Sequence, residues 1–166
     1  MADLHSSTRL RTAALLLGAG LGGFVDGFAL HQIAQWHNML SAVYPPTDME
    51  AMRLNMTADG WFHAGVWALT VAGVLLLYDA ACEETWPPPL PWFVGTLLVG
   101  AGLFNLVEGV VDHHLLEVHH VRDLPRHVPA YDWAFLLLAG LGPVIAGWLL
   151  SRTAASHADE LSPAPP

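Results

Sequence analysis

The chain contains four long stretches of mainly apolar residues, separated by shorter polar segments. The stretches cover about residues 12–42, 60–79, 91–121 and 131–151. A helix needs about 20 mostly apolar residues to cross a bilayer core of about 30 Å. The apolar runs are continuous rather than alternating, and they are too long for β-strands. The pattern therefore predicts an all-α membrane protein with four transmembrane helices.

Prolines mark the connections between these stretches, at positions 45–46, 87–89, 125 and 129. Proline lacks an N–H group and restricts the residue before it, so helices tend to end near such positions. We expect residues 1–11 to form an N-terminal tail and residues 12–151 to form a single transmembrane domain. The final segment, 152–166, is rich in Ala, Ser and Pro, which is typical of a disordered tail.

Composition supports a membrane location and excludes several classes of soluble protein. Hydrophobic residues make up 54% of the chain and charged residues only 13%, whereas soluble domains carry about 25% charged residues. Six Lys and Arg residues stand against fifteen Asp and Glu residues, so no basic surface exists to bind nucleic acid. The single cysteine, Cys82, excludes a disulfide framework. We therefore expect an integral protein of the cell (plasma or inner) membrane, with the lipid bilayer as its main partner.

The basic residues give little information about orientation in the membrane. Cytoplasmic loops usually carry the excess of Lys and Arg, but here three arginines fall on each expected side. They are Arg9, Arg11 and Arg152 against Arg53, Arg122 and Arg126. The two arginines just before the first helix favour a cytoplasmic N-terminus.

The first and third stretches resemble each other when they are aligned at an offset of 82 residues. Residues 18–38 and 100–120 share eight of 21 positions without a gap. The aligned polar residues are Asp26 with Glu108, His31 with His113, and His37 with His119. Both helices must run in the same direction, since one return helix separates them. The sequence therefore predicts a duplicated helical hairpin, with a pseudo-twofold axis along the membrane normal.

The chain has ten histidines, more than its Lys and Arg together. With α-helical periodicity, Glu108, Asp112 and His119 fall on one stripe of the third helix, while His113 falls on another. The first helix repeats this separation, with Asp26 and His31 on different stripes. Ionisable groups are costly inside a bilayer unless they are paired or act as ligands. Because so many occur at matching positions, we interpret them as functional. His127, in contrast, is expected to be a solvated loop residue.

The depth of these groups follows from the rise of a helix. At about 1.5 Å per residue, His37 and His119 would lie about 16 Å from the level of Asp26 and Glu108. His63, one turn into the returning helix, would lie level with the upper histidines. The pattern thus predicts a ladder of ionisable groups from the bilayer midplane to one membrane surface.

Imidazoles combined with carboxylates favour zinc, copper or iron, and the absence of paired thiolates argues against a soft cysteine site. Helical bundles build metal and haem sites from side chains on facing helices. The core candidates are His37, His63 and His119, with a carboxylate as ligand or orienting partner. The full set of candidate metal ligands is His31, His37, Asp59, His63, Asp112, His113 and His119. Alternatively, His37 and His119 could bind one haem from both sides.

Asp26 and Glu108 are expected to lie too far from the upper histidines to bind the same ion. They could pair across the axis, where two close carboxylates share a proton, and could serve as a proton relay. This supports a second function class, a proton- or cation-coupled permease, for which a homodimer would supply eight helices. A metal-dependent membrane enzyme is a third alternative, and the pattern does not decide whether the protein is an enzyme.

Several segments resemble an uncharacterised bacterial membrane-protein family, domain of unknown function 2243. They are GGFVDGFALHQIAQWHNML, DGWFHAGVW, GLFNLVEGVVDHHLLEVHHVR and YDWAFLLLAG. The resemblance covers about residues 12–150, and the run NLVEGVVDHHLL is its most specific part. It implies a four-helix integral membrane protein of the cell envelope but supplies no activity. Members look similar to a group found near cytochrome-oxidase assembly factors. This implies copper or haem handling, with respiratory-chain or oxidase-assembly proteins as partners.

Overall fold

The computed structural model describes residues 2–82 and 87–160, with side chains described for 8–82 and 87–153. The described residues contain helices and no strands. The elements are α1 (Ala2–Asp26), η1 (Gly27–Ile33), α2 (Met49–Ala81), α3 (Leu90–Glu108), η2 (Gly109–Leu115), α4 (Pro129–Phe135), η3 (Leu136–Leu141) and α5 (Gly142–Glu160). The three η elements are π-helical and continue directly from the α-helices before them.

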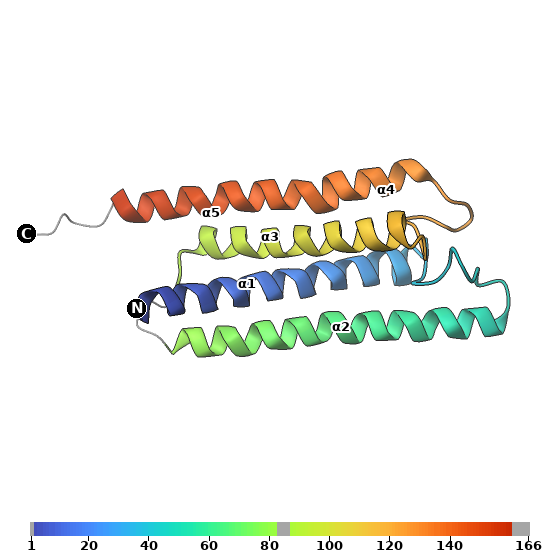
Figure 1. The fold of residues 1–166 in the computed structure, drawn as a ribbon, viewed down its shortest axis with the longest axis horizontal. Helices are drawn as coiled ribbons and strands as arrows, with labels where there is room; N and C mark the ends of the chain where they lie inside the picture. The colour runs from blue at the N-terminus through green and yellow to red at the C-terminus, as the bar shows by residue number, and fades with distance from the viewer. Residues whose placement is uncertain (1, 83–86, 161–166) are drawn as a thin grey trace, which may run out of the picture.

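Four helices are long and apolar enough to cross a membrane, which confirms the prediction of an all-α fold with four candidate spans. They cover Thr8–Ile33, Met49–Ala81, Leu90–Leu115 and Pro129–Thr153. Helix α1 packs against α2 and α3, and α3 packs against α5, so the helices lie in the order α2, α1, α3, α5 (Figure 1). The α1 and α3 spans form the inner pair, since 50% and 39% of their apolar windows are buried, against 17% for each outer span.

Glycines allow the inner helices to approach until their backbones touch. A Cβ at Gly18 would collide with the carbonyl oxygen of Leu97, and a Cβ at Gly100 would collide with the backbone of α1. The α3–α5 contact is similar, because a Cβ at Gly95 would lie 2.6 Å from the carbonyl oxygen of Gly147. Small residues at helix interfaces are a common basis of tight packing in membranes.

The first and third helices end earlier than the sequence predicts. The expected helices, 12–42 and 91–121, end at Ile33 and Leu115. Gln35 and Glu117 follow with positive φ angles of 51° and 49°. This left-handed conformation turns the chain away from the helix axis. The segments 34–48 and 116–128 then fold over the same end of the bundle (Figure 1).

Other helices extend further than expected. Helix α2 begins at Met49 rather than near residue 60, because the Asp48 carboxylate caps its first turn. Asp48 accepts hydrogen bonds of 2.9 Å from the backbone N–H groups of Glu50 and Ala51. Helix α1 starts at Ala2 and α5 continues to Glu160, so the segments expected as tails are largely helical. Neither stretch contains a proline to interrupt the helix. Residues 161–166 of the expected disordered tail lie outside the described residues.

The buried core of the described residues is more polar than apolar. Its apolar members are Ala13, Ala14, Val66, Ala80 and Val121. Its polar members are Asp26, His31, His37, Ser41, Asn55, Asp59, Thr96, Glu108, His113, His119 and Asp132. Large apolar side chains instead cover the exterior, where Trp61 is 76% exposed. An apolar exterior around a polar interior fits a bundle surrounded by lipid.

Gly18→Ala is expected to destabilise the fold, because the new methyl group would overlap the backbone of α3. Overpacking of this kind costs about 1–3 kcal/mol. Gly65→Ala is the matched control, since nothing lies within 4 Å of its added Cβ. There, alanine should stabilise the helix by up to about 1 kcal/mol. Thermal unfolding in detergent measures both variants, and equal melting temperatures would contradict the close α1–α3 contact.

Candidate functional site

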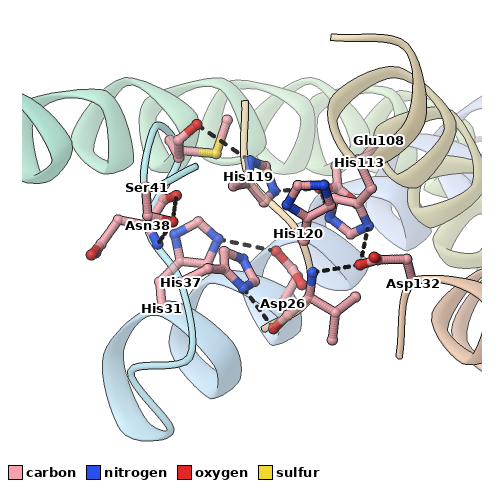
Figure 2. Close-up of polar contacts among 12 residues, drawn as sticks. Asp26, His31, His37, Asn38, Ser41, Glu108, His113, His119, His120 and Asp132 are labelled. Carbon is pink, nitrogen blue, oxygen red and sulfur yellow. Dashed lines mark hydrogen bonds and ion pairs between the residues drawn. The ribbon is translucent and has the colours of Figure 1, made fainter. Parts of the chain in front are cut away.

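Eight ionisable side chains meet at the end of the bundle that the segments 34–48 and 116–128 cover. We call them the central cluster: Asp26, His31, His37, Asp59, Glu108, His113, His119 and Asp132. Each is 7% exposed or less. Figure 2 shows that all of them except Asp59, which is not labelled there, converge from both inner helices, both covering segments and the start of α4. Asp59 comes from α2. The structure thus brings together seven residues that the sequence analysis singled out.

Two π-helical segments pair a carboxylate with an imidazole five residues later. His31 Nε2 lies 3.4 Å from Asp26 Oδ2, and His113 Nε2 lies 3.1 Å from Glu108 Oε1. The stripes predicted from α-helical periodicity separate these partners, because residues five apart do not share a face of an α-helix. Hydrogen bonds from residue i to i+5 widen the turns of η1 and η2. The predicted stripes are wrong here because the widened turns bring each pair onto one face.

The outer helices each supply a second carboxylate. Asp59 of α2 accepts a 3.0 Å hydrogen bond from His31 Nδ1 at its Oδ1 atom. Asp132 of α4 places Oδ1 at 3.7 Å from His113 Nδ1. Each of these two imidazoles therefore lies between a carboxylate of its own helix and a carboxylate of the neighbouring helix.

The segments that fold over the bundle bring His37 and His119 back to the level of the deep carboxylates. The Nδ1–H group of His37 donates a 2.9 Å hydrogen bond to the carbonyl oxygen of Val121, and His119 Nδ1 lies 3.3 Å from that of Met39. Each ring is thus held by the opposite segment. Glu108 Oε1 lies only 3.0 Å from His119 Nε2. The predicted separation of about 16 Å between these levels is wrong, because the helices end before His37 and His119.

Glu108 also links two imidazoles through a single oxygen. Its Oε1 atom is within 3.1 Å of both His113 Nε2 and His119 Nε2. Donor atoms of these three residues lie within 4.8 Å of one another, and so do donor atoms of His31, His37 and His119. The cluster therefore contains two overlapping triads of possible metal ligands, which share His119.

Several polar atoms in the central cluster are buried without a hydrogen-bond partner. The clearest case is His37, whose Nδ1 carries the proton because it bonds to a carbonyl oxygen, so that Nε2 presents a lone pair to the cluster. Glu108 Oε2 is a second atom of this kind. Asp26 Oδ2, His31 Nε2 and both ring nitrogens of His113 make no hydrogen bond either, but each lies within 3.7 Å of an ion-pair partner. A buried polar atom without a partner costs about 1–3 kcal/mol, so His37 Nε2 and Glu108 Oε2 indicate a ligand site.

Electrostatics favour a bound cation. The cluster holds four carboxylates and contains no Lys or Arg. His37, which lies outside the membrane spans, has a pKa well below its ordinary value. Burial disfavours its charged form, and the nearby imidazoles of His119 and His31 would repel a positive charge. His37 is therefore neutral at neutral pH, the form in which an imidazole binds a metal.

Two predicted ligands, His63 and Asp112, lie outside the central cluster, and a third, Asp59, lies within the cluster but outside both triads. The ring nitrogen Nδ1 of His63 donates a 2.7 Å hydrogen bond to the carbonyl oxygen of Asp59. Asp112 is half-buried and lines a small cavity beside Glu108. Asp132, in contrast, belongs to the cluster although it was not among the predicted ligands. The signal for it was a lone carboxylate at the start of an otherwise uncharged helix.

A cavity of about 570 Å³ reaches the central cluster from the side of α2. His31 and Asp59 contribute to its wall, together with His63. The remaining lining residues are Gln32, Gln35, Asn38, Pro46, Met52, Met56, Gly60 and Leu124. The cavity therefore borders the central cluster on this side, with the His31 side chain itself fully buried behind its wall.

The model of a family described as "Predicted membrane protein (DUF2243)" matches residues 13–154. No curated protein and no solved structure matches the chain.

Acidification is expected to destabilise the metal-free protein through His37. The folded-state pKa of His37 is below the unfolded value of about 6.5, so the unfolded chain binds a proton that the folded protein does not. The free energy of unfolding should therefore fall as the pH drops below about 6.5, by up to about 1.4 kcal/mol per pH unit from this residue. Unfolding in detergent with a chelator, at about pH 7 and about pH 5.5, measures the loss.

The control for this experiment is His37→Asn, whose side-chain amide can still donate to Val121 but does not titrate. The variant should lose less stability than the wild-type protein over the same pH interval. Parallel pH profiles for the two proteins would show that His37 is not the source of the dependence.

Proposed function

The chain belongs to the DUF2243 family of predicted membrane proteins, and we propose that its central cluster binds a transition-metal ion within the membrane protein. The description of the family names no activity, so the proposal depends on the site itself. Its ligands would come from the two triads, with His37 and His119 at the centre.

The observation that carries this proposal is the unpartnered Nε2 atom of His37. Its ring is 1% exposed and fixed through Nδ1, and its lone pair faces donor atoms of His31 and His119 within 4.8 Å. A hydrogen bond from the opposite nitrogen is the usual way in which a protein orients a metal-binding imidazole. Asp59 acts in the same way on His31, through Nδ1.

The donor set favours zinc, copper or iron. Imidazole and carboxylate suit these ions, and the single cysteine, Cys82, is exposed and free. A copper or iron ion would give the site a redox function, in keeping with a role in respiratory-chain metal handling. An ion fits better than haem, because the His37 and His119 rings stack with centroids 4.7 Å apart and 14° between their planes. Rings in this arrangement leave no room for a porphyrin between them.

We also infer that the site arose by duplication of a helical hairpin. The two π segments, Gly27–Ile33 and Gly109–Leu115, are 82 residues apart in the sequence. His37 and His119 are separated by the same offset. The positive-φ residues Gln35 and Glu117 have the same offset. Asp59 and Asp132 complete the correspondence, since each accepts a 2.8 Å hydrogen bond from a backbone N–H of the segment that covers its own hairpin. If the hairpin was duplicated, each half supplies one set of ligands to a shared site.

The cavity beside α2 favours a second candidate function, a metal-dependent enzyme. His31 belongs both to the all-histidine triad and to the cavity wall. An ion at this triad would therefore be accessible to a small molecule, as catalysis requires of an open coordination position.

The metal proposal predicts that protein purified in detergent without a polyhistidine tag contains near-stoichiometric metal. His119→Gln should remove the equivalent that the central cluster binds, because His119 belongs to both triads. His114→Gln is the matched control, as its ring packs against Trp133 and belongs to neither triad. Elemental analysis measures the metal, and an optical spectrum without a Soret band separates an ion from haem.

Metal removal should also lower the melting temperature of the wild-type protein. A ligand present at about 100 times its dissociation constant stabilises the folded state by about 2.7 kcal/mol. His119→Gln should show a smaller response to a chelator than the wild-type protein. Wild-type protein that purifies without metal, and whose melting temperature is unchanged by chelator and by added zinc, copper or iron, would refute the proposal and favour the proton-relay alternative.

The enzyme candidate predicts that azide reaches the ion through the cavity. Azide should alter the visible spectrum of the cobalt-substituted protein, and Met56→Trp should weaken this effect by filling the cavity that Met56 lines. Leu138→Trp serves as control, because Leu138 is 77% exposed on the exterior. A spectrum that azide leaves unchanged in the wild-type protein would count against an open coordination position.

A further inference from the structure

A further group of metal-ligand side chains lies at the edge of the central cluster: it combines His120 and His127 of segment 116–128 with Asp132 of α4, which also belongs to the cluster. His120, His127 and Asp132 place donor atoms within 4.8 Å of one another. The side chain of His127 is 39% exposed, that of His120 is 14% exposed, and that of Asp132 is 3% exposed. The group therefore leads from the protein surface to a buried carboxylate.

His120 is oriented like a metal ligand. Its Nδ1–H group donates a 3.0 Å hydrogen bond to Asp123 Oδ1, so Nε2 presents a lone pair. Asp123 is fixed in turn, because its Oδ2 atom accepts hydrogen bonds from the Ser41 hydroxyl at 2.6 Å and from the backbone N–H of His120 at 3.2 Å. A carboxylate that holds a histidine through its other nitrogen is a common feature of metal sites.

His127 completes the pair of imidazoles. Its ring stacks on that of His120, with centroids 3.8 Å apart and 27° between the planes. Its Nε2 atom lies 2.8 Å from Asp132 Oδ2. His127 is exposed, as expected of a solvated loop residue, but the segment also folds its ring onto Asp132.

Neither arginine of this segment, Arg122 or Arg126, forms an ion pair with these carboxylates among the described contacts. Arg122 donates through Nε to the carbonyl oxygen of Leu124. Its guanidinium lies over the Trp36 ring, 5.4 Å from the centroid, and near the Tyr131 ring. The aromatic contacts thus hold Arg122 beside the group without an ion pair to Asp123 or Asp132 among the described contacts. The local charge favours a cation.

We propose that His120, His127 and Asp132 form a second, outer site for a divalent transition-metal ion of the Zn²⁺ class. Two imidazoles and one carboxylate are a common zinc donor set, and the exposed side of His127 leaves room for water as a further ligand. The site does not depend on metal binding in the central cluster, since its imidazoles belong to neither triad.

Asp132 connects the outer site to the central cluster. Its Oδ2 atom faces His127 at 2.8 Å, while its Oδ1 atom accepts a 2.8 Å hydrogen bond from the Val121 N–H and lies 3.7 Å from His113 Nδ1. An ion in the outer site would be one carboxylate away from the buried histidines. The outer site then acts as the acquisition point from which the central cluster is loaded, a role that rests on the proposed function of that cluster.

The test measures, by equilibrium dialysis, how much Zn²⁺ the full-length, metal-free protein binds in detergent. His127→Gln and His120→Gln should each remove one Zn²⁺ equivalent relative to wild type, while the control His114→Gln should remove none. Asp123→Asn should retain this equivalent but bind it about 10–100-fold more weakly, because His120 loses its orienting partner. Co²⁺ in place of Zn²⁺ reports the same losses as changes in the visible spectrum, independently of any loss of stability.

The variants separate this proposal from the proposed function. If His127→Gln and His120→Gln bind as much Zn²⁺ as wild type with equal affinity, the outer site is refuted, whether or not His119→Gln loses metal. If His127→Gln loses one equivalent and His119→Gln loses none, the outer site stands and the central site fails. Slower loading of the central equivalent in His127→Gln supports the acquisition role, and an unchanged loading rate overturns it.

Discussion

Imidazoles and carboxylates that are buried together in a lipid-surrounded bundle must find their partners within the protein, because neither lipid nor water can supply them there. This constraint explains the local departures from regular helix. Asp26 and Glu108 meet His31 and His113 only because η1 and η2 widen the helical turn. The segments that follow turn back and do not extend the helices. The polar contacts thereby tie all four spans together at one end of the bundle.

The rest of each helix pair is held in a different way. Away from the central cluster, glycine contacts such as Gly18 with Leu97 bring the backbones together, and the apolar side chains face outward. Contacts between small residues fix the spacing of helices but carry no charge. The fold thus separates a tightly packed region from a polar end. A bound cation would offset the negative charge of the four carboxylates at that polar end only. Function and packing therefore make few conflicting demands on the same residues.

The sequence was sufficient to predict the four spans, because length and apolarity alone decide them. It also identified most of the cluster, since ionisable residues at matching positions 82 apart are unexpected in a membrane helix. It could not predict that Gln35 and Glu117 adopt positive φ, because glycine is the usual signal for that conformation. It also could not predict π-helical turns, whose pattern has no signal in α-helical periodicity. Both errors concerned backbone geometry, and together they misplaced His37 and His119 by several helical turns.

The two halves of the site differ most beyond their outer carboxylates, and this difference bears on how the site is reached. Asp59 Oδ2 accepts a 2.7 Å hydrogen bond from the Asn38 amide and lines the cavity beside α2. The corresponding oxygen of Asp132 meets an imidazole, that of His127. An amide cannot bind a transition-metal ion as strongly as an imidazole does. Under the proposed function, ions would therefore arrive on the side of His127, and small molecules would arrive through the cavity. Under the proposed duplication, two identical halves would offer only one kind of access, and the different partners of Asp59 and Asp132, Asn38 and His127, would give the shared centre two separate routes.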